Sequence, residues 1–161
     1  MDNNTDRNLV VDVKNLHISF KTFKGYSKVL NGVNLQVHKR ERIAIVGETG
    51  CGKTTTVSAI AQILAKQARI DKGEIFFNGK SVLKMNAKEL KKMRENGISI
   101  IFQDPIASLN PVFTIGNQMR EVIRYSGIDG ATDKNVQTER TIAALKETSM
   151  PDPERIMESY P

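Results

Sequence analysis

Hydrophobic and polar residues alternate through the first part of the chain in patterns that predict β-structure. Residues 9–20 are rich in β-branched and apolar side chains, which indicates a strand. Residues 21–28 are polar and include a glycine, so we expect a hairpin loop there. Residues 29–38 alternate apolar and polar positions, which predicts a half-buried second strand. The wholly apolar run 43–46 is typical of a strand buried inside a parallel sheet.

A helical pattern begins directly after position 54. Val57, Ile60, Ala61 and Leu64 recur at the i, i+3, i+4, i+7 spacing of an amphipathic helix. Beyond this helix the pattern predicts a strand and turn at 73–82, a short basic helix from Asn86 to about Glu95, a buried strand at 98–102, and helices at 114–125, 134–149 and from Asp152.

Two of these helices carry recognisable starting signals. Asn86 is followed three residues later by a glutamate, the arrangement of a reciprocal cap at a helix N-terminus. Asp152 followed by Pro153 combines a good N-cap with a residue suited to the first helical turn. No clean linker interrupts the chain, so we expect one domain with a β-rich subregion at 1–111 and the start of a helical subregion at 112–161.

Composition narrows the class of protein. The 161 residues are 39% hydrophobic and 26% charged, as in ordinary globular proteins, and no apolar run reaches the roughly 18 residues of a membrane span. The polar N-terminus lacks the apolar core of a signal peptide, and one cysteine with two histidines argues against a disulfide or a structural zinc site. The net charge of +6 comes from scattered basic residues without interleaved aromatics, so we expect no nucleic-acid partner. These features predict a soluble, cytoplasmic α/β protein.

The segment after the apolar run 43–46 carries the strongest chemical signal. Residues 47–54, GETGCGKT, match the phosphate-loop pattern G-x-x-x-x-G-K-[ST], with a strand expected before it and a helix after it. The glycines permit backbone conformations in which N–H groups converge on phosphate oxygens at a helix N-terminus. Lys53 would supply positive charge to the β- and γ-phosphates, and the Thr54 hydroxyl would ligate Mg²⁺. Cys51 is either a small neutral residue among the glycines or a thiol that reacts when the site is empty.

A second signal lies 50 positions after Lys53, where residues 101–111 read IFQDPIASLNP. Gln103 follows an expected strand, and its amide oxygen can ligate a metal ion or orient a water molecule. This string closely resembles the Q-loop of ABC transporter ATPases, and the continuation SLNP is similar to the oligopeptide/dipeptide importer group. The resemblance covers essentially the whole chain. It implies the α/β P-loop NTPase fold of an ABC ATPase, with an antiparallel β subregion, the start of a helical subdomain, and a domain that is incomplete in this sequence.

The resemblance also implies roles for individual residues. Lys53 and Gln103 would serve catalysis, and Thr54 and Gln103 would ligate Mg²⁺. Phe20, 27 positions before the first glycine of the loop, resembles the aromatic residue that stacks on adenine, with Phe23 and Tyr26 as alternatives. The residues that would hold the phosphates of ATP are Gly47, Glu48, Thr49, Gly50, Cys51, Gly52, Lys53, Thr54 and Thr55.

The sequence departs from the family pattern in two ways. At the turn before the run 43–46 the family usually has a glycine, where this chain has lysine, arginine and glutamate at 39–41; another turn type can serve there. The LSGG-like signature motif is expected shortly after a Tyr-Pro pair, and the sequence ends on such a pair at 160–161. The Walker B aspartate, the catalytic glutamate and the D-loop are also absent from it. So is the switch histidine, since His17 and His38 both precede the phosphate loop.

These absences bear on activity. Without a Walker B aspartate and a catalytic glutamate, we expect residues 1–161 alone to fold marginally and to show little or no ATPase activity. For the full-length protein the resemblance implies ATP hydrolysis that drives peptide import at the cytoplasmic face of the membrane. Its partners would be transmembrane permease subunits, a second ATP-binding subunit in a homo- or heterodimer, and indirectly an extracytoplasmic substrate-binding protein.

Two alternative functions concern the same residues. The chain could be a truncated, non-catalytic fragment that binds nucleotide or transporter subunits, using the same residues. A GTPase or small kinase is disfavoured, because the N-K-x-D guanine motif does not occur and the string around Gln103 belongs to neither class.

Overall fold

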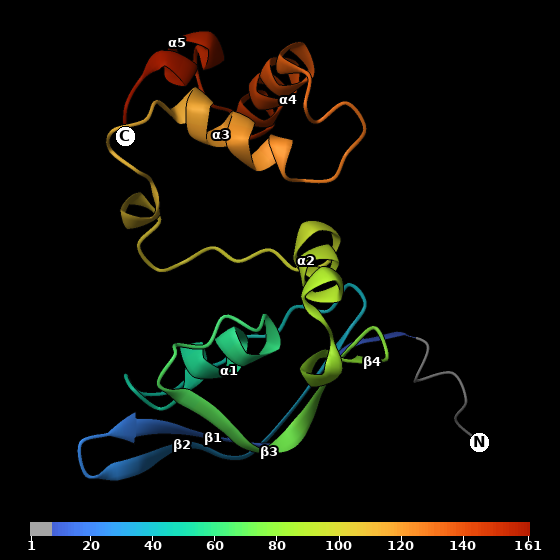
Figure 1. Cartoon of the computed structure of the whole chain (residues 1–161), viewed down its shortest axis with the longest axis vertical. Helices are drawn as coiled ribbons and strands as arrows, with labels where there is room; N and C mark the ends of the chain where they lie inside the picture. Colours follow the sequence, from blue (N-terminus) through green and yellow to red (C-terminus); the bar gives the residue numbers. More distant parts are fainter. Residues whose placement is uncertain (1–7) are drawn as a thin grey trace. The chain divides into compact units, whose positions relative to one another are not determined.

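The computed structural model describes residues 8–161, which fall into two compact units (Figure 1). The first unit is Met1–Asn96 and the second is Gly97–Pro161. The first is built on a β-sheet and the second on helices. No helix among residues 8–161 combines the length and the apolar character needed to cross a membrane.

The sheet of the first unit has four strands in the order β2-β1-β3-β4, and every pairing between neighbours is antiparallel. The strands are β1 (Leu9–Thr22), β2 (Gly25–His38), β3 (Ala68–Phe77) and β4 (Lys80–Ser81). The long strand β1 therefore lies between β2 and β3, and its residues form the centre of the sheet.

Alternation along β1 places the core on one face of this sheet. Leu16 and Ile18 are buried, and Ile18 lies opposite Leu30 of β2 and Ile70 of β3. Burying β-branched and leucine side chains in this way is worth about 1.5–3 kcal/mol per residue. Gly73 of β3 has φ +105°, and a Cβ there would lie 2.4 Å from the carbonyl O of Asn15, so this close approach of two strands requires glycine.

The hairpin between β1 and β2 is tighter than the sequence predicts. The expected loop at 21–28 is wrong, because β1 continues to Thr22 and β2 resumes at Gly25. Lys21 pairs with Tyr26, and the Thr22 hydroxyl donates to the Gly25 carbonyl at 3.1 Å. Polar residues can occupy these positions because ladder hydrogen bonds use the backbone and both side-chain faces here are exposed.

Helix α1 (Lys53–Ile60) follows the phosphate loop and packs against β2. It is shorter than expected, and the predicted apolar stripe is borne out only in part. Ala61, just after the helix, is buried, whereas Val57 is 42% exposed, and the buried residues within the helix are Thr56 and Ala59. Gln62 adopts φ 55° soon after the helix ends, which interrupts the helical path before β3 begins. The buried positions here are taken by small side chains rather than by the large apolar ones.

The two apolar runs expected as buried strands are not strands. Residues 43–46 and 98–102 have no regular structure, and their side chains include Val46 at 91% exposed and Ile101 at 89% exposed. An apolar run becomes a buried parallel strand only when strands on both sides pair with it. None of the strands formed by residues 8–161 pairs with either run, so the backbone of both runs lacks a ladder.

The capping signal at the end of the first unit is confirmed. Asn86 Oδ1 accepts hydrogen bonds from the N–H groups of Lys88 and Glu89, both at 3.0 Å. The Glu89 carboxylate accepts from the Asn86 N–H at 2.9 Å, which completes a reciprocal capping box for α2 (Ala87–Asn96). A short 3₁₀ turn, η2 (Val82–Lys84), connects β4 to this helix.

The second unit contains three helices that the pattern predicts, α3 (Ile115–Arg124), α4 (Lys134–Glu147) and α5 (Pro153–Glu158). It also contains a short 3₁₀ turn, η3 (Ile106–Ser108). The three helices pack on one another. Thr114 caps α3 and Asp152 caps α5 through their side chains. Gly116 allows α3 and α5 to approach closely, because a Cβ there would lie 2.7 Å from the Met157 carbonyl O.

Candidate functional site: the phosphate loop

The loop 47–52 turns the chain sharply into α1. Gly50 has φ 84° and Gly52 has φ 99°, both in the left-handed region that favours glycine. Gly52 is also buried: a Cβ there would lie 2.5 Å from Leu30 Cδ2 and 3.4 Å from the Val29 carbonyl O. The contact with β2 thus lies where the loop becomes a helix. Glycine suits this position because the backbone has a positive φ and there is little room for a side chain.

The first half of the loop closes on itself. The Cys51 N–H donates to the Glu48 carbonyl at 3.3 Å, which makes a turn. A Cβ on Gly47 would lie 2.8 Å from Cys51 Sγ, so a side chain at position 47 would displace the exposed Cys51 thiol. Residues 47–51 are all exposed to solvent.

Lys53 reaches back across the loop that precedes it. Its Nζ donates to the carbonyl oxygens of Gly47 and Glu48, both at 2.7 Å, and lies 3.8 Å from Cys51 Sγ. The lysine therefore holds the two ends of the loop together and places a positive charge at its centre. An anion in the loop would meet this ammonium group directly.

The N-terminus of α1 supplies further donors. No side chain caps the helix at Gly52, and the first N–H groups of any helix have no partner within it. The Thr56 N–H and hydroxyl both bond to the Gly52 carbonyl, at 2.9 and 3.0 Å, which anchors the first turn. Thr54 is exposed and Thr55 is half-buried, so the Thr54 hydroxyl is accessible from solvent. The uncapped N-terminus of α1, its dipole and the Lys53 ammonium group together suit an anion such as phosphate.

The Mg²⁺ expected beside Thr54 would have few protein ligands in this chain. A hydroxyl is a suitable hard oxygen ligand for Mg²⁺. Among residues 8–161, however, no three His, Cys, Asp or Glu side chains gather into a group that could hold a metal ion. The residues therefore fit a cation that arrives with phosphate oxygens, as Mg²⁺ commonly does.

Phe20 lies on the same face of the sheet as the core residue Ile18, two positions away along β1. It is half-buried and pairs with Ser27 of β2 and Ala68 of β3. Ser27 is two residues before Val29, which contacts the loop at Gly52. Phe20 thus lies close along the sheet to the segment of β2 that supports the phosphate loop.

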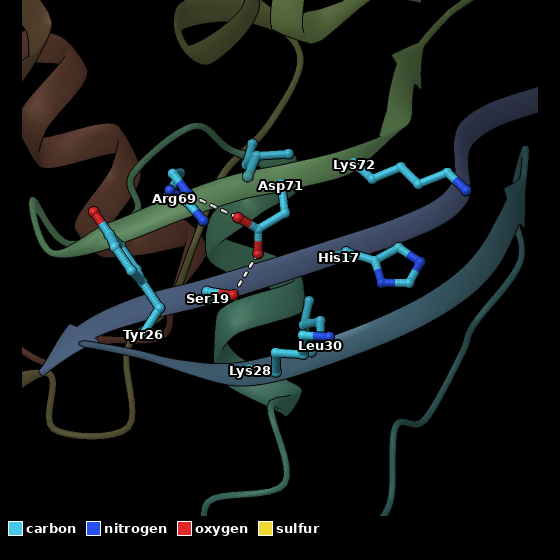
Figure 2. A pocket seen from close by; sticks show the side chains of 9 residues that line it. His17, Ser19, Tyr26, Lys28, Leu30, Arg69, Asp71 and Lys72 are labelled. Carbon is cyan, nitrogen blue, oxygen red and sulfur yellow. Dashed lines mark hydrogen bonds and ion pairs between the residues drawn. The ribbon is translucent and has the colours of Figure 1, made fainter. Parts of the chain in front are cut away.

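The two alternative aromatic residues are placed differently. Tyr26 stacks on the Arg69 guanidinium, 4.1 Å from its Cζ to the ring centroid, and Arg69 lies opposite Ser19 on the other face of the sheet (Figure 2). Phe23 is fully exposed in the two-residue turn of the hairpin. Phe20 thus lies on the face that carries the core and α1, and Tyr26 lies on the other.

Gln103 belongs to the second unit, in an exposed segment without regular structure. The turn that follows it is well bonded: Asp104 Oδ1 accepts from the Ala107 N–H at 3.2 Å, and the Ser108 hydroxyl donates to the Pro105 carbonyl at 2.6 Å. The side chain of Gln103 thus extends from the start of an ordered turn. Its role at a metal ion stays a prediction.

The departure at 39–41 is accommodated by a side-chain cap. Arg40 adopts φ 65°, where a glycine would be unstrained. Glu41 Oε2 accepts from the His38 N–H at 2.6 Å and lies 3.1 Å from His38 Nδ1. These hydrogen bonds hold the pKa of Glu41 below its ordinary value. The turn before the phosphate loop is therefore stabilised by a carboxylate rather than by glycine.

Sequence reasoning missed Val29 and Leu30, the β2 residues that contact Gly52. Both lie in a strand that the pattern predicts, but no local signal marks them as neighbours of the loop. Their contact with the loop depends on the packing of α1 on β2, which the sequence pattern does not reveal.

A comparison with protein families identifies the class to which this fold and loop belong. The family model described as ABC transporter matches residues 30–160, which is most of the chain. The chain belongs to the ABC transporter family.

Individual relatives carry more specific names. The chain is 36% identical over 162 residues to the probable peptide ABC transporter ATP-binding protein y4tR of Sinorhizobium fredii, covering 100% of the chain and 48% of that protein. It is 36% identical over 154 residues to the oligopeptide transport ATP-binding protein OppD of Bacillus subtilis, covering 94% of the chain and 42% of that protein. The chain thus spans about half the length of the curated relatives it matches.

A solved structure supports the fold. The dimeric, post-hydrolysis ATP-binding cassette MJ0796, bound to ADP and Pi, superposes with a TM-score of 0.78 at 23% identity, covering 94% of this chain and 61% of that one. The expected fold class is confirmed: the chain has part of an ABC ATPase fold, with an antiparallel sheet and a set of helices.

Proposed function

We propose that this chain binds MgATP at the loop 47–55 and that it is part of an ATP-binding subunit of a peptide ABC importer. The observation that carries the proposal is the position of Lys53, whose ammonium group lies at the centre of the loop on the carbonyls of Gly47 and Glu48. In the complex the phosphate oxygens would share the loop N–H groups and this ammonium group.

The other residues take supporting roles in this proposal. The Thr54 hydroxyl ligates the Mg²⁺ that accompanies the phosphates, and the Gln103 amide oxygen completes the shell around the metal ion and the attacking water. Phe20 stacks on the adenine, since its ring lies on the face that carries α1. Mg²⁺ would supply charge neutralisation at the β- and γ-phosphates.

For the whole protein we propose ATP hydrolysis coupled to peptide import at the cytoplasmic face of the membrane. The names of the relatives support this, as peptide and oligopeptide transport ATP-binding proteins. The partners would be transmembrane permease subunits and a second ATP-binding subunit; the solved relative is itself dimeric. The 161 residues alone contain no Walker B aspartate and no catalytic glutamate, so we propose that they bind nucleotide with little or no turnover.

The test is an equilibrium titration of the chain with a fluorescent ATP analogue and Mg²⁺. Lys53→Ala removes charged hydrogen bonds to phosphate and should weaken binding by about 10- to 100-fold. Lys66→Ala, an exposed lysine outside the loop, makes the same change in net charge and should bind as the unaltered chain does. Equal affinities of Lys53→Ala and the unaltered chain for the ATP analogue would contradict the proposal.

A further inference from the structure

The face of the sheet opposite α1 contains a recess with a volume of about 540 Å³ (Figure 2). It lies over the middle of β1 and is bordered by β2 and β3, wholly within the first unit. Volumes of this size are typical of ligand-binding clefts. We define it by the residues at its two ends and refer to it as the Tyr26–Lys72 recess.

Positive charge predominates in the Tyr26–Lys72 recess. Lys28, Arg69 and Lys72 line it, against the single carboxylate of Asp71. That carboxylate already accepts hydrogen bonds from the Ser19 hydroxyl and from Arg69 Nε, the latter at 2.7 Å. These bonds lower the pKa of Asp71, so it remains a carboxylate whose charge is matched by Arg69.

The three cations of the recess outnumber its one carboxylate by two. Within the part of the chain that the structure describes, no ion pair involves Lys28 or Lys72. Arg69 donates from Nε to Asp71 and stacks its guanidinium on Tyr26, and among the described residues its terminal N–H groups form no ion pair. The recess therefore offers three cationic side chains with unused N–H donors around the Asp71 carboxylate, which is already hydrogen-bonded.

The partners of β1 place these groups opposite alternate β1 residues, although β3 has a register irregularity between Ile70 and Lys72. Lys28 and Arg69 lie on either side of Ser19, Lys72 lies opposite His17, and Tyr26 lies opposite Lys21 in the other direction. The steps from residue 21 to 19 and from 19 to 17 are two strand residues each, or about 6.6 Å. In an extended peptide, side chains on one face repeat at the same distance.

We propose that the Tyr26–Lys72 recess binds an extended acidic peptide segment of another protein. One carboxylate of the segment pairs with Lys28 and Arg69, and a second, two residues on, pairs with Lys72. An apolar or aromatic side chain two residues before the first carboxylate packs on the open face of Tyr26. The recognised pattern is thus apolar-x-acidic-x-acidic, and the site is separate from the phosphate loop, which lies on the other side of the sheet with α1.

The elongated spacing favours a peptide over a compact phosphate ion. Lys28 and Arg69 lie on strands separated by β1, so their backbones are about 9.5 Å apart. Lys72 is three residues beyond Arg69 on β3 and lies opposite His17, two residues from Ser19 along β1. A single phosphate group is too small to engage all three cations at this spacing. Carboxylates on alternate residues of an extended chain match it, and Tyr26 offers a surface for a side chain that phosphate lacks.

The test is fluorescence anisotropy with a labelled pentapeptide that has phenylalanine at position 1 and glutamate at positions 3 and 5. Two control peptides carry glutamine at positions 3 and 5, or both glutamates side by side at positions 2 and 3. The chain is compared with a Lys28→Ala, Lys72→Ala double variant. A Lys24→Ala, Lys80→Ala double variant is the matched control, because both lysines are exposed, lie outside the recess and change the net charge equally.

We expect the alternating glutamate peptide to bind more tightly than either control peptide. The Lys28→Ala, Lys72→Ala variant should lose about 3- to 10-fold in affinity, while the matched control variant should lose none. Equal binding of the glutamate and glutamine peptides, or equal loss in both double variants, would overturn the proposal. Displacement of the peptide by pyrophosphate in a Lys53→Ala background would also overturn it, in favour of a phosphate ligand at the same lysines.

Binding of this peptide and binding of nucleotide are distinguishable. The Lys53→Ala variant should bind the peptide as the unaltered chain does, whatever its affinity for ATP. A loss of peptide binding on Lys53→Ala would place the peptide at the phosphate loop and contradict the proposed site.

Discussion

The ammonium group of Lys53 donates hydrogen bonds to the carbonyl oxygens of Gly47 and Glu48, each at 2.7 Å. One residue of the phosphate loop thus holds the loop closed before any ligand enters. When phosphate oxygens are present, they compete for the same donors. Lys53 therefore stabilises the closed loop through these hydrogen bonds and is also its main source of positive charge.

Gly52 is the residue whose replacement should damage the loop most. Gly52→Ala would force a side chain into a left-handed backbone conformation and onto Leu30, 2.5 Å away. The left-handed backbone conformation alone lowers the free energy of unfolding by about 1–2 kcal/mol for alanine, and the clash with Leu30 lowers it further. Urea denaturation measures this loss.

Gly50→Ala is the matched control for Gly52→Ala. Gly50 also has a positive φ, but a Cβ there would meet nothing within 4 Å. It should show the backbone cost without the clash, so its loss of stability should be smaller. Equal losses for the two variants would contradict the contact between Gly52 and β2.

Cys51 should report on occupancy of the loop. Its thiol is exposed, lies 3.8 Å from Lys53 Nζ and packs beside Gly47. We predict that MgATP slows alkylation of Cys51, because bound phosphates cover the loop. Mass spectrometry of iodoacetamide labelling over time measures the rate; equal rates with and without MgATP would show that Cys51 acts only as a small neutral residue.

Phe20 and Tyr26 should differ in their effect on nucleotide affinity. Phe20→Ala should weaken ATP binding by ~1–3 kcal/mol, the usual contribution of stacking between a base and an aromatic ring. Tyr26→Ala should leave ATP affinity unchanged, since its ring packs against Arg69 on the other face of the sheet. The same fluorescent titration measures both; an effect of Tyr26→Ala larger than that of Phe20→Ala would reverse the assignment.

Glu41 should make stability depend on pH. Its pKa in the folded chain lies below its ordinary value of 4.5, because the His38 N–H and ring donate to the carboxylate. The stabilisation is therefore fully present above pH 4.5 and is lost as the pH falls through the folded pKa. Denaturation midpoints measured between neutral pH and pH 3 should show this loss.

Glu41→Gln should reduce that acid-dependent loss of stability. Glu74→Gln, which alters an exposed carboxylate of β3 outside this turn, is the matched control. If both variants retained the same acid dependence as the unaltered chain, the cap formed by Glu41 would not contribute to stability.

Much of this architecture follows from local sequence signals. The phosphate loop, the helix caps at Asn86, Thr114 and Asp152, and the strand character of β1 and β2 depend on residues close together in the chain. Short-range chemistry determines such features, because a cap needs only a side-chain oxygen and an N–H two or three residues away.

The incorrect predictions share a different cause. Residues 43–46 and 98–102 have the composition of buried strands, but no strand among residues 8–161 pairs with them. The length of α1 and its buried residues depend on how closely it packs on β2, where small side chains fit. The contact of Gly52 with Leu30 likewise joins segments that are far apart in sequence, so periodicity could not reveal it.

The most direct test of the central proposal is to record amide NMR spectra of the chain with and without MgATP. We predict that chemical-shift changes concentrate on the amides of residues 47–55, and that Lys53→Ala abolishes them. Unchanged amides at 47–55 under saturating MgATP, or changes confined to other residues, would contradict nucleotide binding at this loop.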